Sequence, residues 1–505
     1  MKWLPWLIFA LFGFFLVGNN FSAKLGMIDD HEIAMFLGPD GKVKVSEFVP
    51  TLMSTEVGQW GTFLRYRPSY YTLRVLETAL WGDNAFLWYL SRYLMLVVSM
   101  WLGWKILTIY FPKIVSYLFV FYIMTIPFWS DVLTRLGPSE IYAVPALLLF
   151  VYGIMKNKLW MIVLGYMTCI GAKENFLFLF PILLLWSGIK IYTKKLSRND
   201  LLATLLMTAY TLFIVGAIYV ATSKTGADIY GAQISYSERF VLLYKYKRYI
   251  VESRHLQLPI LIAMATFVKV AIIAYRQGVQ KLVNNTLFKH LVVLGIVGMA
   301  IATQYIFYNS QIPNNMRYDY PVMILFPVFQ LTSLSLLIAI LPKKIFRIST
   351  PLIVYMCLGV ILFSFITKRG YYHIQNRALI NSQATQSFDI NLLSFYKVAT
   401  ENPDSTFVFV SNKFFAYEPM ISVARYLTAK KVMNKMVISY TPEPNVVDPL
   451  GIELESLITA SMNGESNDDK SFERFSPISS IGNSCFSITF GDAAPLPDCP
   501  TIAKF

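Results

Sequence analysis

The sequence has few charged side chains for its length. Of its 505 residues, 15% are Asp, Glu, Lys or Arg and 55% are hydrophobic, and the mean hydropathy is +0.50. Water-soluble domains carry about 25% charged residues, so this composition excludes an ordinary soluble fold and indicates that a bilayer is the main solvent. The net charge of +14 does not indicate nucleic-acid binding, because many basic residues lie in short segments between apolar runs, where positive charge sets membrane orientation.

Cysteine is also scarce, with four residues in the chain. Cys169 and Cys357 lie in apolar runs and are expected to be packing residues. Cys485 and Cys499 lie in the polar C-terminal region, close enough in sequence to pair if that region faces an oxidising compartment. A structural disulfide is therefore expected there.

Internal repeats and a cleavage motif are absent from the sequence. The lack of a repeat weighs against transporters built from inverted repeats. The first apolar segment, residues 3–17, is followed by Gly-Asn-Asn-Phe and not at once by a small-x-small cleavage site. We therefore expect a retained helix there.

Apolar runs that suit membrane helices recur through the first two thirds of the chain. Spanning takes roughly 20 apolar residues, and fewer where a helix is broken or partly buried. The candidate spans are residues 3–17, 85–109, 114–129, 141–155, 159–170, 176–192, 201–221, 258–274, 291–308, 321–341 and 351–366. They predict an all-α polytopic membrane domain of about eleven helices over residues 1–367. Several candidates are short, and the two that flank residues 171–175 could dip into the protein without crossing the bilayer.

The connecting segments predict the orientation of these helices. With the N-terminus inside, the inside connectors carry Lys113, Lys156, Lys158, Lys194, Lys195, Arg198, Arg276, Lys281, Lys289, Lys343, Lys344 and Arg347, and their single acid is Asp200. This is the positive-inside pattern. Residues 224–255 are the exception, because they are assigned outside yet mix basic residues with tyrosines; we expect them to lie along the membrane surface.

On this topology nearly all acidic residues and polar clusters fall on the outer face. The first external loop, residues 18–84, contains two segments with helix-like apolar spacing, 46–57 and 68–81, which we expect to lie on the membrane as interfacial helices.

Residues 368–505 have a different sequence pattern from the apolar runs before them. Strand patterns at 406–410 and 435–440, with a helical pattern at 420–431 between them, predict a small extracytoplasmic α/β domain.

The most informative motif is Ile28-Asp29-Asp30-His31-Glu32, just beyond the first helix. Ionisable residues at the end of a membrane helix can form no more than a solvated turn. The rest of the first loop favours a functional site, because two interfacial helices beside an acidic pair would make a covered pocket that lipids can reach.

Here the sequence resembles the GT-C superfamily of membrane glycosyltransferases, which use sugars linked to lipid phosphates. That family has an acidic motif in its first external loop, often Asp-Asp, followed by interfacial helices, and it often has a C-terminal external domain. Asp29 and Asp30 stand where the motif belongs, and the organisation is similar across the whole chain. The small C-terminal region and the lack of a Trp-Trp-Asp motif make the chain more similar to enzymes that use a polyprenyl-phosphate monosaccharide than to oligosaccharyltransferases.

The resemblance implies an inverting transfer, whose chemistry asks for particular side chains. One of Asp29 and Asp30 would take the proton of the acceptor hydroxyl, since two adjacent carboxylates away from bulk water push one pKa upward. The leaving phosphate needs fixed positive charge. Arg317 and Tyr318 stand in a stretch similar to the Arg-Tyr-x-x-Pro of some GT-C enzymes, which holds the lipid phosphate. The alternative for Arg317 is an arginine that snorkels to the membrane interface.

Further candidates lie at predicted outer helix ends. They are Lys173 for the phosphate, Glu140, Glu174, Arg135 and His31 for the sugar or the acceptor, and Arg65, Arg67 and Arg74 for lipid head groups or interfacial anchoring. For Lys173, Glu140, Glu174 and Arg135 the alternative is that they form ion pairs with one another. We predict no required metal and no cofactor, because the four histidines offer no ligand spacing and cations alone can serve a phosphate leaving group.

The predicted function is transfer of a monosaccharide from a polyprenyl-phosphate donor to a hydroxyl of a glycan, glycolipid or protein acceptor. The predicted location is a bacterial inner membrane, with the active site facing the periplasm. The alternative is a transporter or flippase for a lipid-linked or anionic substrate. It would place ionisable residues at mid-membrane, where the predicted spans hold few, among them Arg92, Lys105 and Lys269. A third alternative is an O-antigen polymerase or ligase.

Overall fold

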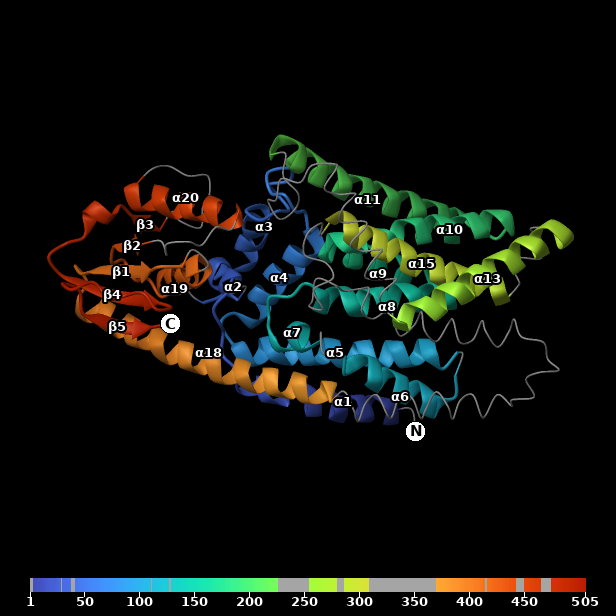
Figure 1. The fold of residues 1–505 in the computed structure, drawn as a ribbon, viewed down its shortest axis with the longest axis horizontal. Coiled ribbons are helices and arrows are strands. Elements are labelled where there is room, and N and C mark those ends of the chain that lie inside the picture. Colours follow the sequence, from blue (N-terminus) through green and yellow to red (C-terminus); the bar gives the residue numbers. More distant parts are fainter. Residues whose placement is uncertain are drawn as a thin grey trace.

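The protein is elongated, with long helices over most of its length and a small sheet at one end (Figure 1). The computed structural model describes residues 3–28, 30–37, 41–109, 111–126, 129–225, 254–278, 286–307, 369–413, 416–441, 449–464 and 474–505. The short helices of the first loop lie between the long helices and the sheet (Figure 1).

The described helices follow the apolar segments predicted from the sequence. Those in the long-helix part are α1 (Leu4–Val17), η1 (Gly18–Ser22), α5 (Ala85–Leu107), α6 (Lys113–Met124), α7 (Trp129–Thr134), α8 (Glu140–Lys156), α9 (Leu159–Ala172), η2 (Glu174–Phe178), α10 (Leu179–Tyr192), α11 (Arg198–Thr225), α13 (Arg254–Gln277) and α15 (Thr286–Phe307). The predicted spans 321–341 and 351–366 lie outside the described residues, as does most of the segment 224–255.

Four helical segments in the described part of the chain are long and apolar enough to cross a membrane. They are Leu4–Ser22, Ala85–Leu107, Glu174–Tyr192 and Arg198–Lys224. Other predicted spans form shorter helices, such as α9 with 14 residues. A helix of that length reaches about 21 Å, less than the roughly 30 Å of a hydrocarbon core. The described helices therefore do not support a count of about eleven spans.

Close backbone packing joins α8 and α9 into a hairpin. Asn157 ends α8 in the left-handed conformation, at φ +51°, and the Lys158 N–H donates to Gly153 O at 2.9 Å. Gly165 lies directly against α8, since a Cβ built on it would stand 2.5 Å from Phe150 N and 2.6 Å from Ala146 O. Small residues permit this approach between neighbouring helices.

The first external loop forms α2 (His31–Phe36), α3 (Val45–Met53) and α4 (Pro68–Trp81). Pro68 opens α4, and Gly82 follows it at φ +58°, a conformation that glycine adopts without strain. α4 turns Leu76 and Leu80 outward, at 42% and 55% exposure. Its buried face is instead rich in polar groups, among them Tyr70, Arg74 and Glu77.

The C-terminal region is a five-stranded parallel sheet with helices packed against it. Its elements are β1 (Thr406–Ser411), α19 (Tyr417–Ala429), β2 (Met436–Tyr440), α20 (Pro449–Asn463), β3 (Phe475–Ser476), β4 (Cys485–Phe490) and β5 (Thr501–Lys504), in the strand order β3-β2-β1-β4-β5. The predicted strands 406–410 and 435–440 and the helix 420–431 are confirmed to within a few residues. The expected disulfide between Cys485 and Cys499 is present.

A single long helix connects the two parts of the molecule. α18 (Gly370–Glu401) packs against α1, η1 and α7 at one end and against α19 and β5 at the other (Figure 1). It begins three residues beyond the boundary predicted between residues 1–367 and 368–505. Phe388 and Phe395 of α18 belong to the core of the C-terminal region.

Candidate functional site

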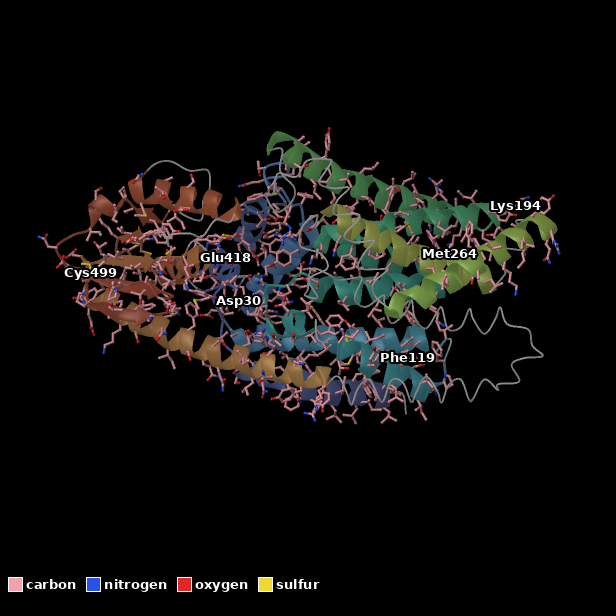
Figure 2. The ribbon with its side chains drawn as sticks, viewed as in Figure 1. Asp30, Phe119, Lys194, Met264, Glu418 and Cys499 are labelled. Atoms are coloured by element: carbon pink, nitrogen blue, oxygen red, sulfur yellow. A yellow bond between two sulfur atoms is a disulfide. The ribbon has the colours of Figure 1, made fainter. Side chains whose placement is uncertain are left out.

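The acidic segment of the first loop lies where the long helices meet the C-terminal region. Figure 2 shows Asp30 beside Glu418 of α19 at this junction, whereas Lys194 of a predicted inside connector lies at the far end of the molecule. Lys194 and Asp30 thus lie toward opposite ends of the long axis of the molecule.

Asp30 lies inside the protein. Its side chain is 5% exposed, and its Oδ2 accepts the backbone N–H of Gly26 at 2.9 Å. The Tyr426 hydroxyl donates to Gly26 O at 2.9 Å, so α19 closes the same turn from the other side. Burial, together with the charge of Asp30, raises the pKa of Tyr426 and keeps this hydroxyl a donor. Asp29 lies outside the described residues.

His31 binds the C-terminal region. Its Nδ1 lies 2.7 Å from Ser422 Oγ of α19, and the same oxygen accepts the N–H of Ile28 at 2.9 Å. Its predicted role toward the sugar or acceptor is not tested by this contact, which positions the acidic segment.

Glu32 faces α4. The Tyr70 hydroxyl donates to Glu32 Oε2 at 2.7 Å, and Arg74 Nε lies 3.8 Å from the same oxygen. Arg74 is fully buried and also donates to Leu136 O at 2.9 Å, which rules out a role as an exposed interfacial anchor. The Glu32 side chain keeps 21% of its surface exposed, so this carboxylate remains reachable from outside.

A second buried group lies one turn further along α4. Glu77 pairs with Arg92 of α5 at 2.7 Å and accepts the hydroxyl of Tyr142 of α8. Arg92 also donates to Tyr142 Oη at 2.7 Å, and Ser91 Oγ donates to Glu77 at 2.5 Å. Arg92 is one of the ionisable residues found within a predicted span, and here opposite charge neutralises it inside the protein.

The structure brings three of the predicted site residues together at the end of α9. Lys173 pairs with Glu140, and Glu174 pairs with Arg65 at 2.8 Å. Lys173, Glu140 and Glu174 are all buried, at 2%, 1% and 0% exposure. Burial lowers the pKa of the Lys173 ammonium, and the carboxylate of Glu140 opposes that shift. The alternative of mutual ion pairs is therefore realised for Lys173 and Glu140.

The remaining predicted residues lie apart from these groups or beyond the described part of the chain. Arg135 pairs with Asp131 at 3.3 Å and is 36% exposed. Arg317 and Tyr318 lie outside the described residues. Within the described part, no three His, Cys, Asp or Glu side chains come together in a way that would hold a metal ion.

The buried polar face of α4 was not predicted from the sequence. Tyr70, Arg74 and Glu77 stand at positions i, i+4 and i+7, which places them on one side of a helix. That spacing was visible in the sequence, but the apolar residues between them favoured a helix with its polar side toward water. The partners Glu32, Arg92 and Tyr142 come from three other helices, and nothing in one sequence pairs them.

No protein-family model matches the sequence, and no curated protein matches it either. A function for this chain therefore rests on its residues and their arrangement.

Proposed function

We propose that the protein is a membrane glycosyltransferase of the GT-C type, which moves a monosaccharide from a polyprenyl-phosphate donor to an acceptor hydroxyl on the outer face of the membrane. The acceptor is a cell-envelope glycan, a glycolipid or a glycoprotein. The observation that carries this proposal is the burial of Asp30 where the long helices meet the C-terminal region. Asp30 is 5% exposed and Glu32 accepts the Tyr70 hydroxyl, which supports a structured site at these two acids over a solvated turn.

The proposed reaction is a displacement at the anomeric carbon. The acceptor oxygen forms a bond to that carbon as the bond from the carbon to the phosphate oxygen breaks, and attack from the opposite face inverts the configuration. The acceptor proton passes to a carboxylate, and the electron pair of the broken bond leaves on the polyprenyl phosphate. Transfer thus needs one base and fixed positive charge at the phosphate.

Asp29 and Asp30 are the proposed bases, and Glu32 is a third acid within the same segment. Arg317 and Tyr318 are the proposed phosphate ligands. Lys173 is retained in that role only if the donor phosphate displaces Glu140, because the two now form an ion pair. Glu174, Arg135 and His31 stay proposed contacts for the sugar or the acceptor.

The proposed topology has about eleven helices and an acidic face in the periplasm of a bacterial inner membrane. Two observations support this orientation. The C-terminal region, on the Asp30 side, contains the Cys485–Cys499 disulfide, which is typical of oxidising compartments. The connector that contains Lys194 and Lys195 lies at the opposite end.

A transporter or flippase is the competing function. The buried Arg92 in a candidate span favours it, since such proteins place ionisable groups within the membrane. The pairing of Arg92 with Glu77 near the start of α5 weakens that argument, because the pair is neutral and holds helices together.

The test is a donor-turnover assay with purified full-length protein. Synthetic polyprenyl-phosphate sugars are incubated with a cell-envelope extract, and free polyprenyl phosphate and glycosylated acceptor are measured by mass spectrometry. The transferase predicts equal amounts of both products. A transporter predicts movement of intact donor across proteoliposome membranes with neither product, and that result would overturn the proposal.

A further inference from the structure

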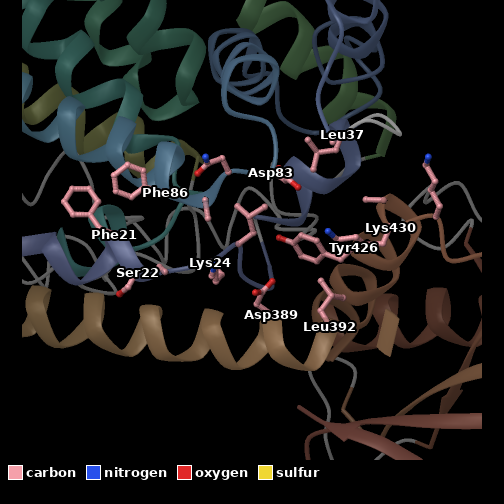
Figure 3. Close-up of a pocket in the computed structure, with 17 residues that line it drawn as sticks. Phe21, Ser22, Lys24, Leu37, Asp83, Phe86, Asp389, Leu392, Tyr426 and Lys430 are labelled. Atoms are coloured by element: carbon pink, nitrogen blue, oxygen red, sulfur yellow. The ribbon is translucent and has the colours of Figure 1, made fainter. Parts of the chain in front are cut away.

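A cavity of about 640 Å³ lies at the junction of the two parts of the molecule. We call it the junction cavity; its walls come from residues 21–25, the turn between α4 and α5, α18, and the C-terminal end of α19. Figure 3 shows Phe21 and Phe86 together at one end, with Tyr426 and Lys430 reaching in from the α19 side. Glu32, Arg74 and Lys173 do not line it, so the junction cavity is separate from the buried ion pairs.

The junction cavity stands at the ends of two candidate spans. Phe21 and Ser22 are the last residues of the span Leu4–Ser22, and Ala85 and Phe86 are the first of the span Ala85–Leu107. A helix end of this kind marks the level at which hydrocarbon gives way to lipid head groups. The cavity therefore opens at head-group depth.

Its charges favour a negatively charged ligand. Lys24, Lys430 and Lys431 line the cavity, against Asp83 and Asp389, an excess of one positive charge. In the described part of the chain none of the three lysines forms an ion pair. Ammonium groups that line a cavity and form no ion pair are suited to a phosphate group.

An aromatic path leads from the cavity to the outer surface of the helices. The Phe21 ring lies 5.7 Å from the ring of Phe86 and 5.9 Å from that of Phe14. Phe14 and Phe86 are 56% and 49% exposed, on sides of α1 and α5 that the described part of the chain leaves uncovered. A soluble anion has no apolar part that would contact these rings, whereas a lipid can place its acyl chains along them.

We propose that the junction cavity binds the phosphate-bearing head group of an anionic phospholipid, with its acyl chains along Phe21 and Phe14. The lipid would then contact the membrane ends of α1 and α5 and the lysines that end α19, and so hold the C-terminal region against the bilayer. This proposal stands independently of the glycosyltransferase proposal.

The test uses the full-length protein in detergent, titrated with phosphatidylglycerol and observed by native mass spectrometry. Replacing the cavity lysines (Lys24→Gln, Lys430→Gln and Lys431→Gln together) should weaken lipid binding by about ten-fold or more. The matched control replaces three exposed lysines elsewhere, Lys397→Gln, Lys435→Gln and Lys504→Gln, and should leave binding unchanged. All of these side chains are exposed, so thermal unfolding should not change.

A second arm distinguishes a lipid from a soluble phosphate. Phe86→Ala should weaken phosphatidylglycerol binding, and glycerol phosphate in excess should fail to displace the lipid. Equal lipid affinity in the cavity and control triple variants would overturn the proposal. So would displacement by glycerol phosphate with no effect of Phe86→Ala, because that outcome describes a site for a free anion.

Discussion

The imidazole Nδ1 of His31 lies 2.7 Å from the hydroxyl oxygen of Ser422, although 391 residues separate the two in sequence. The same hydroxyl donates to Glu418 O at 2.8 Å and accepts the N–H of Ile28 at 2.9 Å. Ser422 is fully buried, so this contact fixes the acidic segment against α19. The position of Asp30 therefore depends on the C-terminal region as well as on the first loop.

Removing that hydroxyl should loosen the junction. Ser422→Ala leaves the Ile28 N–H without its acceptor and removes the contact with His31 Nδ1, and an unsatisfied buried group costs about 1–3 kcal/mol. We expect a lower unfolding temperature and faster proteolysis within residues 18–37. Ser394→Ala on the exposed side of α18 is the control and should change neither. Unchanged proteolysis in Ser422→Ala would show that the contact does not hold the segment.

The Glu77–Arg92 pair should be costly to break on one side only. Arg92→Met leaves a buried carboxylate without its cation, which costs about 3–5 kcal/mol. The double variant Glu77→Leu with Arg92→Met removes both charges and should recover much of the loss in chemical denaturation. Lys397→Met is the control, because the pair of Lys397 with Glu401 is exposed and such pairs contribute about 0–1 kcal/mol. Equal losses in the single and double variants would contradict this account.

The α8–α9 hairpin should not tolerate a methyl group at Gly165. Gly165→Ala would place a Cβ 2.5 Å from Phe150 N and 2.6 Å from Ala146 O, so the helices must separate. We expect a loss of about 1–3 kcal/mol, as for other overpacked sites. Gly216→Ala on α11 meets nothing within 4 Å and should be neutral or stabilising by about 0.5–1 kcal/mol. Thermal unfolding of both variants in one detergent gives the comparison, and equal shifts would argue against close helix contact.

The Cys485–Cys499 disulfide tests where the C-terminal region resides. The disulfide joins cysteines 14 residues apart, and a cross-link of this length stabilises the folded state by about 3 kcal/mol in the loop-entropy model. Cys485→Ser with Cys499→Ser should therefore lower the denaturant midpoint of the sheet. In intact cells the two thiols should resist alkylation until a reductant is added. Free thiols in untreated cells would place this region in a reducing compartment and reverse the proposed orientation.

Most helices could be located from the sequence, because a long apolar segment such as 85–109 predicts a helix, here α5. Length was harder to judge. The segment 159–170 is apolar enough for lipid, yet it forms a helix of 14 residues packed against α8. Hydropathy measures how readily a side chain leaves water, and it does not tell whether lipid or protein then surrounds that side chain. The strands β4 and β5 were missed. β4 is buried along nearly its whole length and so shows no clear alternation, and β5 has only four residues.

The candidate site was predictable only in part. Asp30 and Glu32 were found because four ionisable residues follow an apolar helix. The side chains that hold this segment in place were not predicted, since Tyr70, Tyr426 and Ser422 lie far away in sequence and show no distinctive pattern. Lys173 and Glu140 were each predicted to meet substrate, and only three-dimensional structure shows that they meet one another.

If a first-loop carboxylate is the base of a sugar transfer, replacing it by a carboxamide removes the proton acceptor and should greatly slow transfer. Asp29→Asn, Asp30→Asn and Glu32→Gln are compared with Glu47→Gln, a control acid from α3 of the same loop. Asn at position 30 keeps an oxygen that can accept the Gly26 N–H, so the protein should stay folded. The measurement is kcat for transfer from a synthetic polyprenyl-phosphate sugar, with thermal unfolding recorded alongside. We expect at least one aspartate variant to lose about 10²-fold or more in kcat while the control keeps full activity. Near-complete activity in both aspartate variants would contradict the account.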